Sequence, residues 1–87
     1  MMINKDLRLR RVDNKNFIVA VGKKSKSFSG MVKLNDTAAM IFELLKKGLS
    51  AEEIAKKLEK DYDISLEKAV SDVENTIEDF EKAGFFL

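Results

Sequence analysis

Few side chains in this sequence could do chemistry, and the missing types exclude most catalytic classes. The 87 residues contain no His, Cys or Trp, so imidazole catalysis, thiolate nucleophiles, disulfides and zinc fingers are all excluded. The four glycines are too far apart to form a phosphate-binding loop. No serine or lysine has a credible base to activate it. We therefore expect no catalytic residue, and a protein that is not an enzyme.

The acidic pairs are explained without a metal ion. Asp61 and Asp63 stand two residues apart, but an EF-hand loop that began there would need Gly at its sixth position, where Leu66 stands. Glu52 and Glu53 suit the first turn of a helix, where the helix dipole favours carboxylates. These patterns predict no metal site and no cofactor.

The charges are divided unequally along the chain. Residues 1–34 carry nine Lys and Arg and two acids, a balance of +7, whereas residues 35–87 carry seven Lys and thirteen acids, a balance of −6. The formal net charge of +1 therefore conceals a basic front half and an acidic back half. Such halves are either two ordinary solvated surfaces or surfaces for charged partners.

The front half has the periodicity of strands. Residues 7–10 alternate apolar and basic side chains, which is typical of a half-buried strand. Residues 13–16 are rich in turn formers, and the apolar run 17–21 suits a central strand. A third strand is predicted from about residue 27 to 34, after a basic turn. The short connections predict an antiparallel meander that follows a tail over residues 1–6.

The back half has the cap signals of three helices. Asn35 is a good N-cap for the first helix, and Gly48 ends that helix. Ser50 opens a capping box for the second helix. Ser65 caps a longer third helix, which Gly84 closes. The apolar stripe of the third helix consists of Val70, Val73, Ile77 and Phe80.

The order of these elements predicts one α+β domain over residues 1–87, a three-stranded antiparallel β-meander followed by three helices. The second and third helices, with a hairpin beside them, resemble a winged helix-turn-helix. The longest apolar run, residues 17–21, is far too short for a membrane span or the core of a signal peptide. We therefore expect a cytoplasmic protein with no membrane contact.

The helix-turn-helix pattern raises nucleic-acid binding as one function. The third helix would be the recognition helix, yet residues 66–83 carry six acids, two Lys and no Arg. These acids would meet the negative charge of a duplex, and no side chain would read guanine in the usual way. A winged-helix nucleic-acid-binding or transcriptional accessory protein is therefore the alternative, not the preferred interpretation.

Peptide binding at a sheet edge is the other function. The third strand of a meander has one unpaired margin, which is a template for an added strand. A docked peptide gains main-chain hydrogen bonds, and its alternate side chains enter pockets. Two plainer interpretations stay open. Lys33 and Gly30 would merely protect the edge, or the edge or the apolar tail 85–87 would pair two copies as a homodimer.

Several short segments of the back half form one ordered set. They are residues 34–39 (LNDTAA), residues 48–55 (GLSAEEIA) with Leu58, residues 62–65 (YDIS), and Val70, Asp72, Val73 and Gly84. Together they resemble the PqqD-like family of leader-peptide recognition elements. Their order and spacing carry the resemblance over residues 7–87, nearly the whole chain.

This resemblance implies a small domain that binds the leader segment of a ribosomally synthesised precursor peptide and presents it to a modifying enzyme. That enzyme is often a radical-SAM maturase, and the founding product is pyrroloquinoline quinone (PQQ). The leader is taken as an extra strand beside the third strand, in a groove shared with the third helix. The implied peptide-binding residues are Phe28, Met31, Val32, Lys33 and Leu34 on the strand and Ala69, Val70, Val73, Thr76 and Ile77 on the helix.

Two points of this assignment stay open at the sequence level. Val70, Val73 and Ile77 suit the core as well as a groove, because they form the stripe that anchors the helix, whereas Ala69 and Thr76 sit beside that stripe. The strands are richer in Lys than those of the founding members, which suggests that the leader is acidic.

Overall fold

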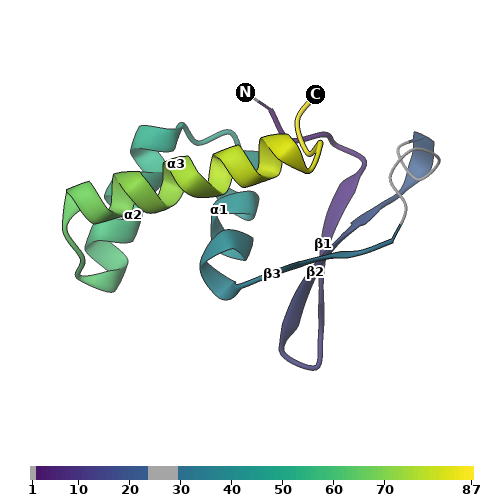
Figure 1. Cartoon of the computed structure of the whole chain (residues 1–87), viewed down its shortest axis with the longest axis horizontal. Coiled ribbons are helices and arrows are strands. Elements are labelled where there is room, and N and C mark those ends of the chain that lie inside the picture. The colour runs from purple at the N-terminus through teal and green to yellow at the C-terminus, as the bar shows by residue number, and fades with distance from the viewer. Residues whose placement is uncertain (1, 24–29) are drawn as a thin grey trace.

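A computed structural model of the chain describes residues 2–23 and 30–87. Its elements are β1 (Leu7–Val12), β2 (Lys15–Ala20), β3 (Val32–Leu34), α1 (Asp36–Lys46), α2 (Ala51–Tyr62) and α3 (Leu66–Lys82). The three strands form one antiparallel sheet in the order β1-β2-β3, and the helices lie together beside it (Figure 1). The predicted α+β meander followed by three helices is confirmed.

The β1–β2 hairpin closes through a two-residue turn. Asp13 and Asn14 both have left-handed backbone, with φ of 51° and 62°, and Val12 pairs with Lys15. Two positive-φ residues match the right-handed twist of the flanking strands, and short Asx side chains tolerate that conformation. The turn is shorter than the predicted 13–16, because β2 already begins at Lys15. The apolar run that follows forms the central strand, as predicted.

The third strand is shorter than predicted where the structure describes it. β3 consists of Val32–Leu34, and Gly30 before it has a φ of 85°. Such left-handed backbone cannot continue an extended strand, and glycine adopts it at little cost. The rest of the predicted strand, which includes Phe28, lies outside the described residues.

The helix caps follow the sequence signals. The side chain of Asn35 accepts from Ala38 N–H at 2.8 Å, and that of Ser65 accepts from Lys68 N–H at 3.1 Å. Ser50 forms both bonds of its capping box. Each cap satisfies an amide that the helix leaves unpaired, so the three helices begin where the sequence predicts.

Three aromatic rings, from α1, from α3 and from the residues that follow α3, lie at the centre of the core. The ring centroids of Phe42 and Phe80 are 6.0 Å apart, and those of Phe42 and Phe85 are 5.9 Å apart, both edge to face. All three rings are buried, together with Leu7 and Ile18 of the sheet. Edge-to-face pairs add to the free energy gained from burial, so this cluster fixes α1 and α3 against each other.

The two ends of the chain lie side by side (Figure 1). Ile3 forms an isolated antiparallel bridge with Phe86, and Asn4 N–H donates to Phe85 C=O at 2.8 Å. Ile3 is buried, although it belongs to the segment expected as a tail. The apolar C-terminal residues therefore pair with the N-terminal segment and not with β3.

None of the helices in the described ranges is long and apolar enough to cross a lipid bilayer.

Candidate functional site

The hydrogen-bonding pattern of the sheet determines which groups β3 presents outward. Residue pairs along an antiparallel ladder alternate between those that exchange main-chain hydrogen bonds and those that do not. Val21 N–H donates to Asp6 C=O at 2.8 Å, so the pair Asp6–Val21 is of the bonded kind. Counting back along the register, odd-numbered residues of β2 bond to β1. Asn16 and Ile18 therefore direct their main-chain groups towards β3.

This alternation leaves Lys33 facing outward. Leu34 and Val32 lie opposite Asn16 and Ile18, so their N–H and C=O groups point towards β2. The Asn16 side chain also donates to Leu34 C=O at 3.3 Å, which agrees with that direction. The N–H and C=O of Lys33 point away from the sheet, at an edge that no other strand of the described chain occupies.

A groove runs between this edge and α3. One part of it is a cavity of about 240 Å³. It is lined by Val32, Lys33, Leu34, Asn35, Ala38, Thr76, Asp79, Phe80, Ala83 and Phe85. A neighbouring hollow shares Asn35 and Thr76 and adds Thr37, Asp72 and Asn75. We call the two together the β3–α3 groove.

The β3–α3 groove has an apolar floor and a polar wall. Val32 and Leu34 are half-buried beside the buried ring of Phe80. On the other side α3 contributes Asp72, Thr76 and Asp79, whose spacing of four and three residues places them on one helix face. Ala83, the C-cap of α3, lines the end of this wall. An extended peptide could bury apolar side chains on the floor while polar groups meet the wall.

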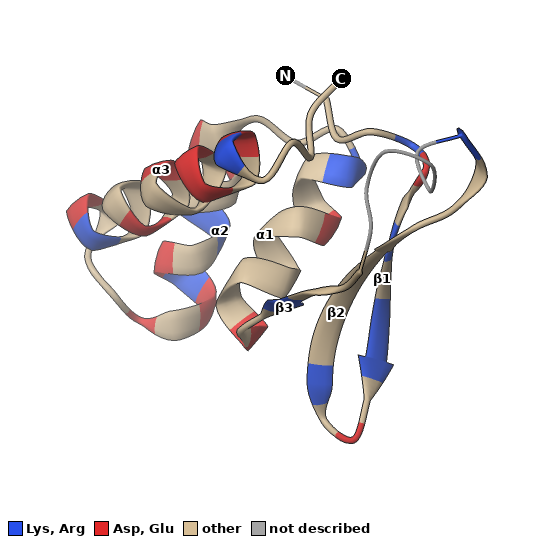
Figure 2. Cartoon of the chain, turned by 45° about the vertical axis from the view of Figure 1, so that its right-hand side comes forward, with Lys and Arg blue, Asp and Glu red and all other residues tan. Residues whose placement is uncertain are grey.

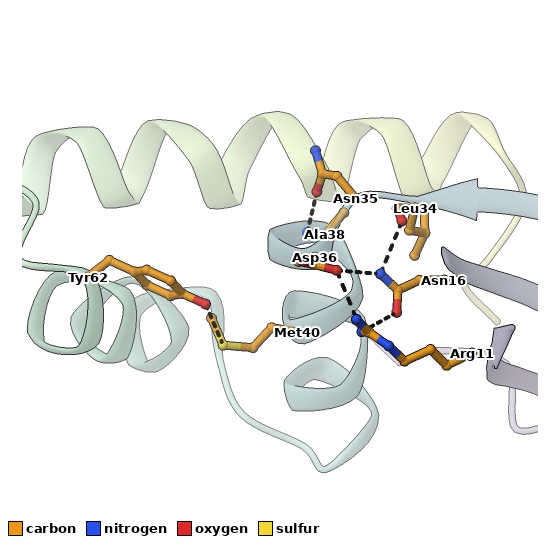
Figure 3. A network of polar contacts seen from close by, with 8 residues as sticks. All are labelled: Arg11, Asn16, Leu34, Asn35, Asp36, Ala38, Met40 and Tyr62. Atoms are coloured by element: carbon orange, nitrogen blue, oxygen red, sulfur yellow. Dashed lines mark hydrogen bonds and ion pairs between the residues drawn. The ribbon is translucent and has the colours of Figure 1, made fainter. Parts of the chain in front are cut away.

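A polar network fixes the end of β3 next to this groove (Figure 3). The Asn16 amide donates to Leu34 C=O at 3.3 Å and to Asp36 Oδ1 at 2.8 Å. Arg11 donates to Asn16 Oδ1 at 3.2 Å and forms an ion pair with Asp36 at 3.6 Å. Asn16 is only 4% exposed. The network therefore ties β1, β2, the end of β3 and the start of α1 to one another.

A lysine makes a second link between the sheet and α1. Lys46 Nζ donates to Leu7 C=O at 2.6 Å. Burial lowers the pKa of Lys46, and the nearby positive charge of Arg8 lowers it further.

Among the described residues, no group of three or more acidic side chains could hold a metal ion.

The basic residues of the strands and the acids of α3 lie on separate elements of the fold (Figure 2). Because side chains alternate along strands, Lys33 shares the sheet face turned away from the helices with Arg8, Arg10 and Lys15. Figure 2 shows blue on the strands and red along α3. The unequal charge seen in the sequence thus becomes a separation in space between the strands and α3.

Four of the ten predicted peptide-binding residues line the β3–α3 groove: Val32, Lys33, Leu34 and Thr76. Met31 precedes β3 and is 66% exposed, but it does not line the cavity. Phe28 lies outside the described residues.

The structure places the other four residues of α3 away from the groove. Ala69 and Val73 are buried in the core, at 0% and 1% exposure. Val70 and Val73 line a different hollow, between α2 and α3. Ile77 is half-buried and packs against the core. Their assignment to peptide binding stays a prediction that rests on the resemblance alone.

Other groove residues were missed at the sequence level. They are Asn35, Ala38, Asp79, Phe80, Ala83 and Phe85, with Thr37, Asp72 and Asn75 in the neighbouring hollow. The signal available was the period of α3. Once Ala69, Val73 and Phe80 are taken as the buried stripe, the face beside them carries Asp72 and Asp79.

These features define a small winged helix-turn-helix-like domain with an open strand edge next to a helix-walled groove. The chain belongs to the PqqD family, because the family model described as "Coenzyme PQQ synthesis protein D (PqqD)" matches residues 15–85.

Two solved structures share the fold. "Lasso peptide synthetase B1 complexed with the leader peptide" has a TM-score of 0.79 at 22% identity, covering 98% of this chain and 94% of that chain. "TbiB1 in Complex with the TbiA(beta) Leader Peptide" has a TM-score of 0.79 at 15% identity, covering 99% and 94%. A search of curated proteins found no match.

Proposed function

We propose that this protein binds the leader segment of a ribosomally synthesised precursor peptide as an added strand at the outer edge of β3. The observation that carries the proposal is the outward N–H and C=O of Lys33 beside the β3–α3 groove. Membership of the PqqD family supports it, and so do two neighbours in fold whose names state a bound leader peptide.

The side chains of the leader supply most of the affinity. The main-chain groups of Lys33 offer two hydrogen bonds, each worth about 1 kcal/mol. An apolar side chain buried on the groove floor contributes about 2 kcal/mol. Association itself costs at least about 4 kcal/mol, so two hydrogen bonds alone would not hold a peptide. The edge therefore sets the register of the leader, and the groove selects its sequence.

The role of the protein is presentation and not catalysis. An ordered leader would raise the effective concentration of the attached core peptide at the active site of a modifying enzyme, such as a radical-SAM maturase. The pathway, PQQ-like or another, would follow from that enzyme. A cytoplasmic location agrees with this role. In a reconstituted reaction, the protein alone should leave the mass of the precursor unchanged, and adding it to the enzyme should raise the rate of modification.

A substitution at Lys33 tests the added strand. Lys33→Pro removes the outward amide, and the bonds of β3 to β2 remain because proline is tolerated where the N–H faces away from the sheet. We expect affinity for the leader to fall about fivefold or more, since one hydrogen bond is worth about 1 kcal/mol. The measurement is fluorescence anisotropy with labelled peptides translated from short reading frames beside the gene.

Lys33→Ala is the matched control, because it removes the same side chain and keeps the amide. Circular dichroism would verify that both variants fold. Equal affinities of the two folded variants would defeat strand addition at β3. Binding of random duplex DNA at low salt, with no affinity for any such peptide, would instead favour a nucleic-acid function, against which the acids of α3 already weigh.

A further inference from the structure

A bound leader would lie between two charged surfaces of opposite sign. A strand added to β3 alternates its side chains between the two faces of the sheet. The guest residue that pairs with Lys33 would share the face of the Lys33 side chain, and the residues on either side of it would point into the β3–α3 groove. The two sets of guest side chains therefore meet different electrostatic environments.

The groove side offers an acid that has no ion-pair partner. Of the two carboxylates on the α3 wall, Asp72 bonds to Lys68 at 2.8 Å. The lysine nearest in sequence to Asp79 is Lys82, and it pairs with Glu78 at 3.0 Å. Asp79 lines the cavity, and no Lys or Arg of the described residues lies within 4.0 Å of its carboxylate. Only a longer-range attraction links it to Lys82, whose pKa the charge of Asp79 helps to raise. A guest strand that covers Asp79 without supplying a cation would desolvate this carboxylate at a cost in free energy.

The opposite face offers cations. Arg10 and Lys33 both lie opposite Phe17 in the register, on the face turned away from the helices. Arg8 and Lys15 share that face, and none of the four forms an ion pair with a described carboxylate. Like-charged neighbours repel one another, so an acidic guest residue beside Lys33 would relieve that repulsion.

We propose that the leader carries charges of both signs in alternation, with a Lys or Arg among its groove-facing residues that pairs with Asp79 and an acidic residue on the opposite face beside Lys33. The inference rests on the proposed function and states which leaders it accepts. It refines the acidic leader suggested by composition, because most of the basic side chains of the strands lie on the sheet face away from the groove. The remaining groove-facing residues are apolar.

An unbiased selection tests this pattern without knowledge of the natural leader. An mRNA-display library of random 12-residue peptides would be panned at low salt over the intact protein and over three variants. Asp79→Lys reverses the charge of the wall, Lys33→Glu reverses the charge beside the edge, and Glu59→Lys makes the same change as Asp79→Lys on an exposed position of α2 outside the groove. All three sites are exposed, so the fold should be retained.

The expected result is a motif in which an acidic position alternates with apolar positions and one basic position. Asp79→Lys should convert the basic position to an acidic one, Lys33→Glu should remove the acidic preference, and Glu59→Lys should leave both preferences intact. For one selected peptide, replacing its basic residue by Gln should weaken binding about three- to tenfold in the wild type and have no effect in Asp79→Asn.

The outcomes separate the inference from the function on which it rests. Enriched peptides without a basic position, or equal motifs for Asp79→Lys and Glu59→Lys, would overturn the charge pattern and leave peptide binding in place. Failure to enrich any peptide over a blank surface would overturn the proposed function itself.

Discussion

Asn16 shows how one buried polar side chain can determine the position of a site. Its amide reaches both the last carbonyl of β3 and the first carboxylate of α1. Every buried side-chain nitrogen and oxygen of the described residues has a hydrogen-bond partner. A buried amide that lost these partners would be costly, so the arrangement specifies one geometry for the strand-to-helix junction.

Replacing Asn16 should destabilise the fold more than replacing its acidic partner. Asn16→Ala leaves Leu34 C=O and Asp36 without their buried donor, so we expect the free energy of unfolding to fall by about 1–3 kcal/mol. Asp36→Asn keeps an acceptor and loses only an exposed ion pair, so its effect should stay below about 1 kcal/mol. Urea denaturation followed by circular dichroism measures both. An equal loss for the two variants would show that the ion pair, and not the amide, holds the junction.

The burial of individual side chains could not be predicted from the sequence where it depends on contacts between elements. Asn16 was expected in a turn because Asx residues favour turns, but the positive φ of Asp13 and Asn14 completes the turn two residues earlier, at Asn14. On α3 the apolar stripe gave the buried side approximately, yet Ala69 is buried and Val70 is 37% exposed. A helix is rotated by its packing partners, and neighbouring positions differ by about 100° around its axis.

At the scale of elements, helix starts were predictable because their signals are local. The capping box of Ser50 uses only residues within one turn, and its bonds form in the structure as the sequence implies. The outward direction of the Lys33 main-chain groups depends instead on which residue pairs of the sheet exchange hydrogen bonds. No local sequence signal gives that alternation. It follows from the hairpin turn and from the register of two strand pairs.

The capping box of α2 should make stability depend on pH in the acid range. Ser50 N–H donates to Glu53 Oε1 at 2.9 Å, and this bond lowers the pKa of Glu53 below its usual 4.5. Since the folded pKa lies below the unfolded one, the stabilisation is present above pH 4.5 and is lost as the pH falls through the folded value. Glu53→Gln should therefore lower Tm at pH 7 and have a smaller effect at pH 3.

The control for that series is Glu59→Gln, which changes an exposed glutamate of the same helix outside the capping box. Thermal melts at pH 7, 5, 4 and 3 would give the difference in Tm between each variant and the wild type. A deficit of Glu53→Gln that stays constant down to pH 3 would contradict the charged cap.

At the scale of the whole molecule, the sequence predicted that the charge is divided between two halves of the chain, but not where those halves lie in the fold. The basic front half forms the sheet and the acidic back half forms the helices, so Figure 2 shows blue on the strands and red along α3. After α3 the C-terminal residues pair with the N-terminal segment through the bridge of Ile3 with Phe86, and not with β3. The outer edge of β3 therefore stays unpaired in the described part of the chain.

An open edge can also pair with a second copy, and Lys33 should prevent this. In an antiparallel pairing of two β3 edges centred on the outward residue, each Lys33 would face its copy, and like charges directly opposite are destabilising. We expect the wild type to sediment as a monomer and Lys33→Val to form dimers at about 100 μM, with leader peptide dissociating them because both compete for one edge. Dimers of the wild type that leader peptide does not dissociate would place self-association elsewhere, for which Leu87, the most exposed large apolar side chain of the described residues at 77%, is the first candidate.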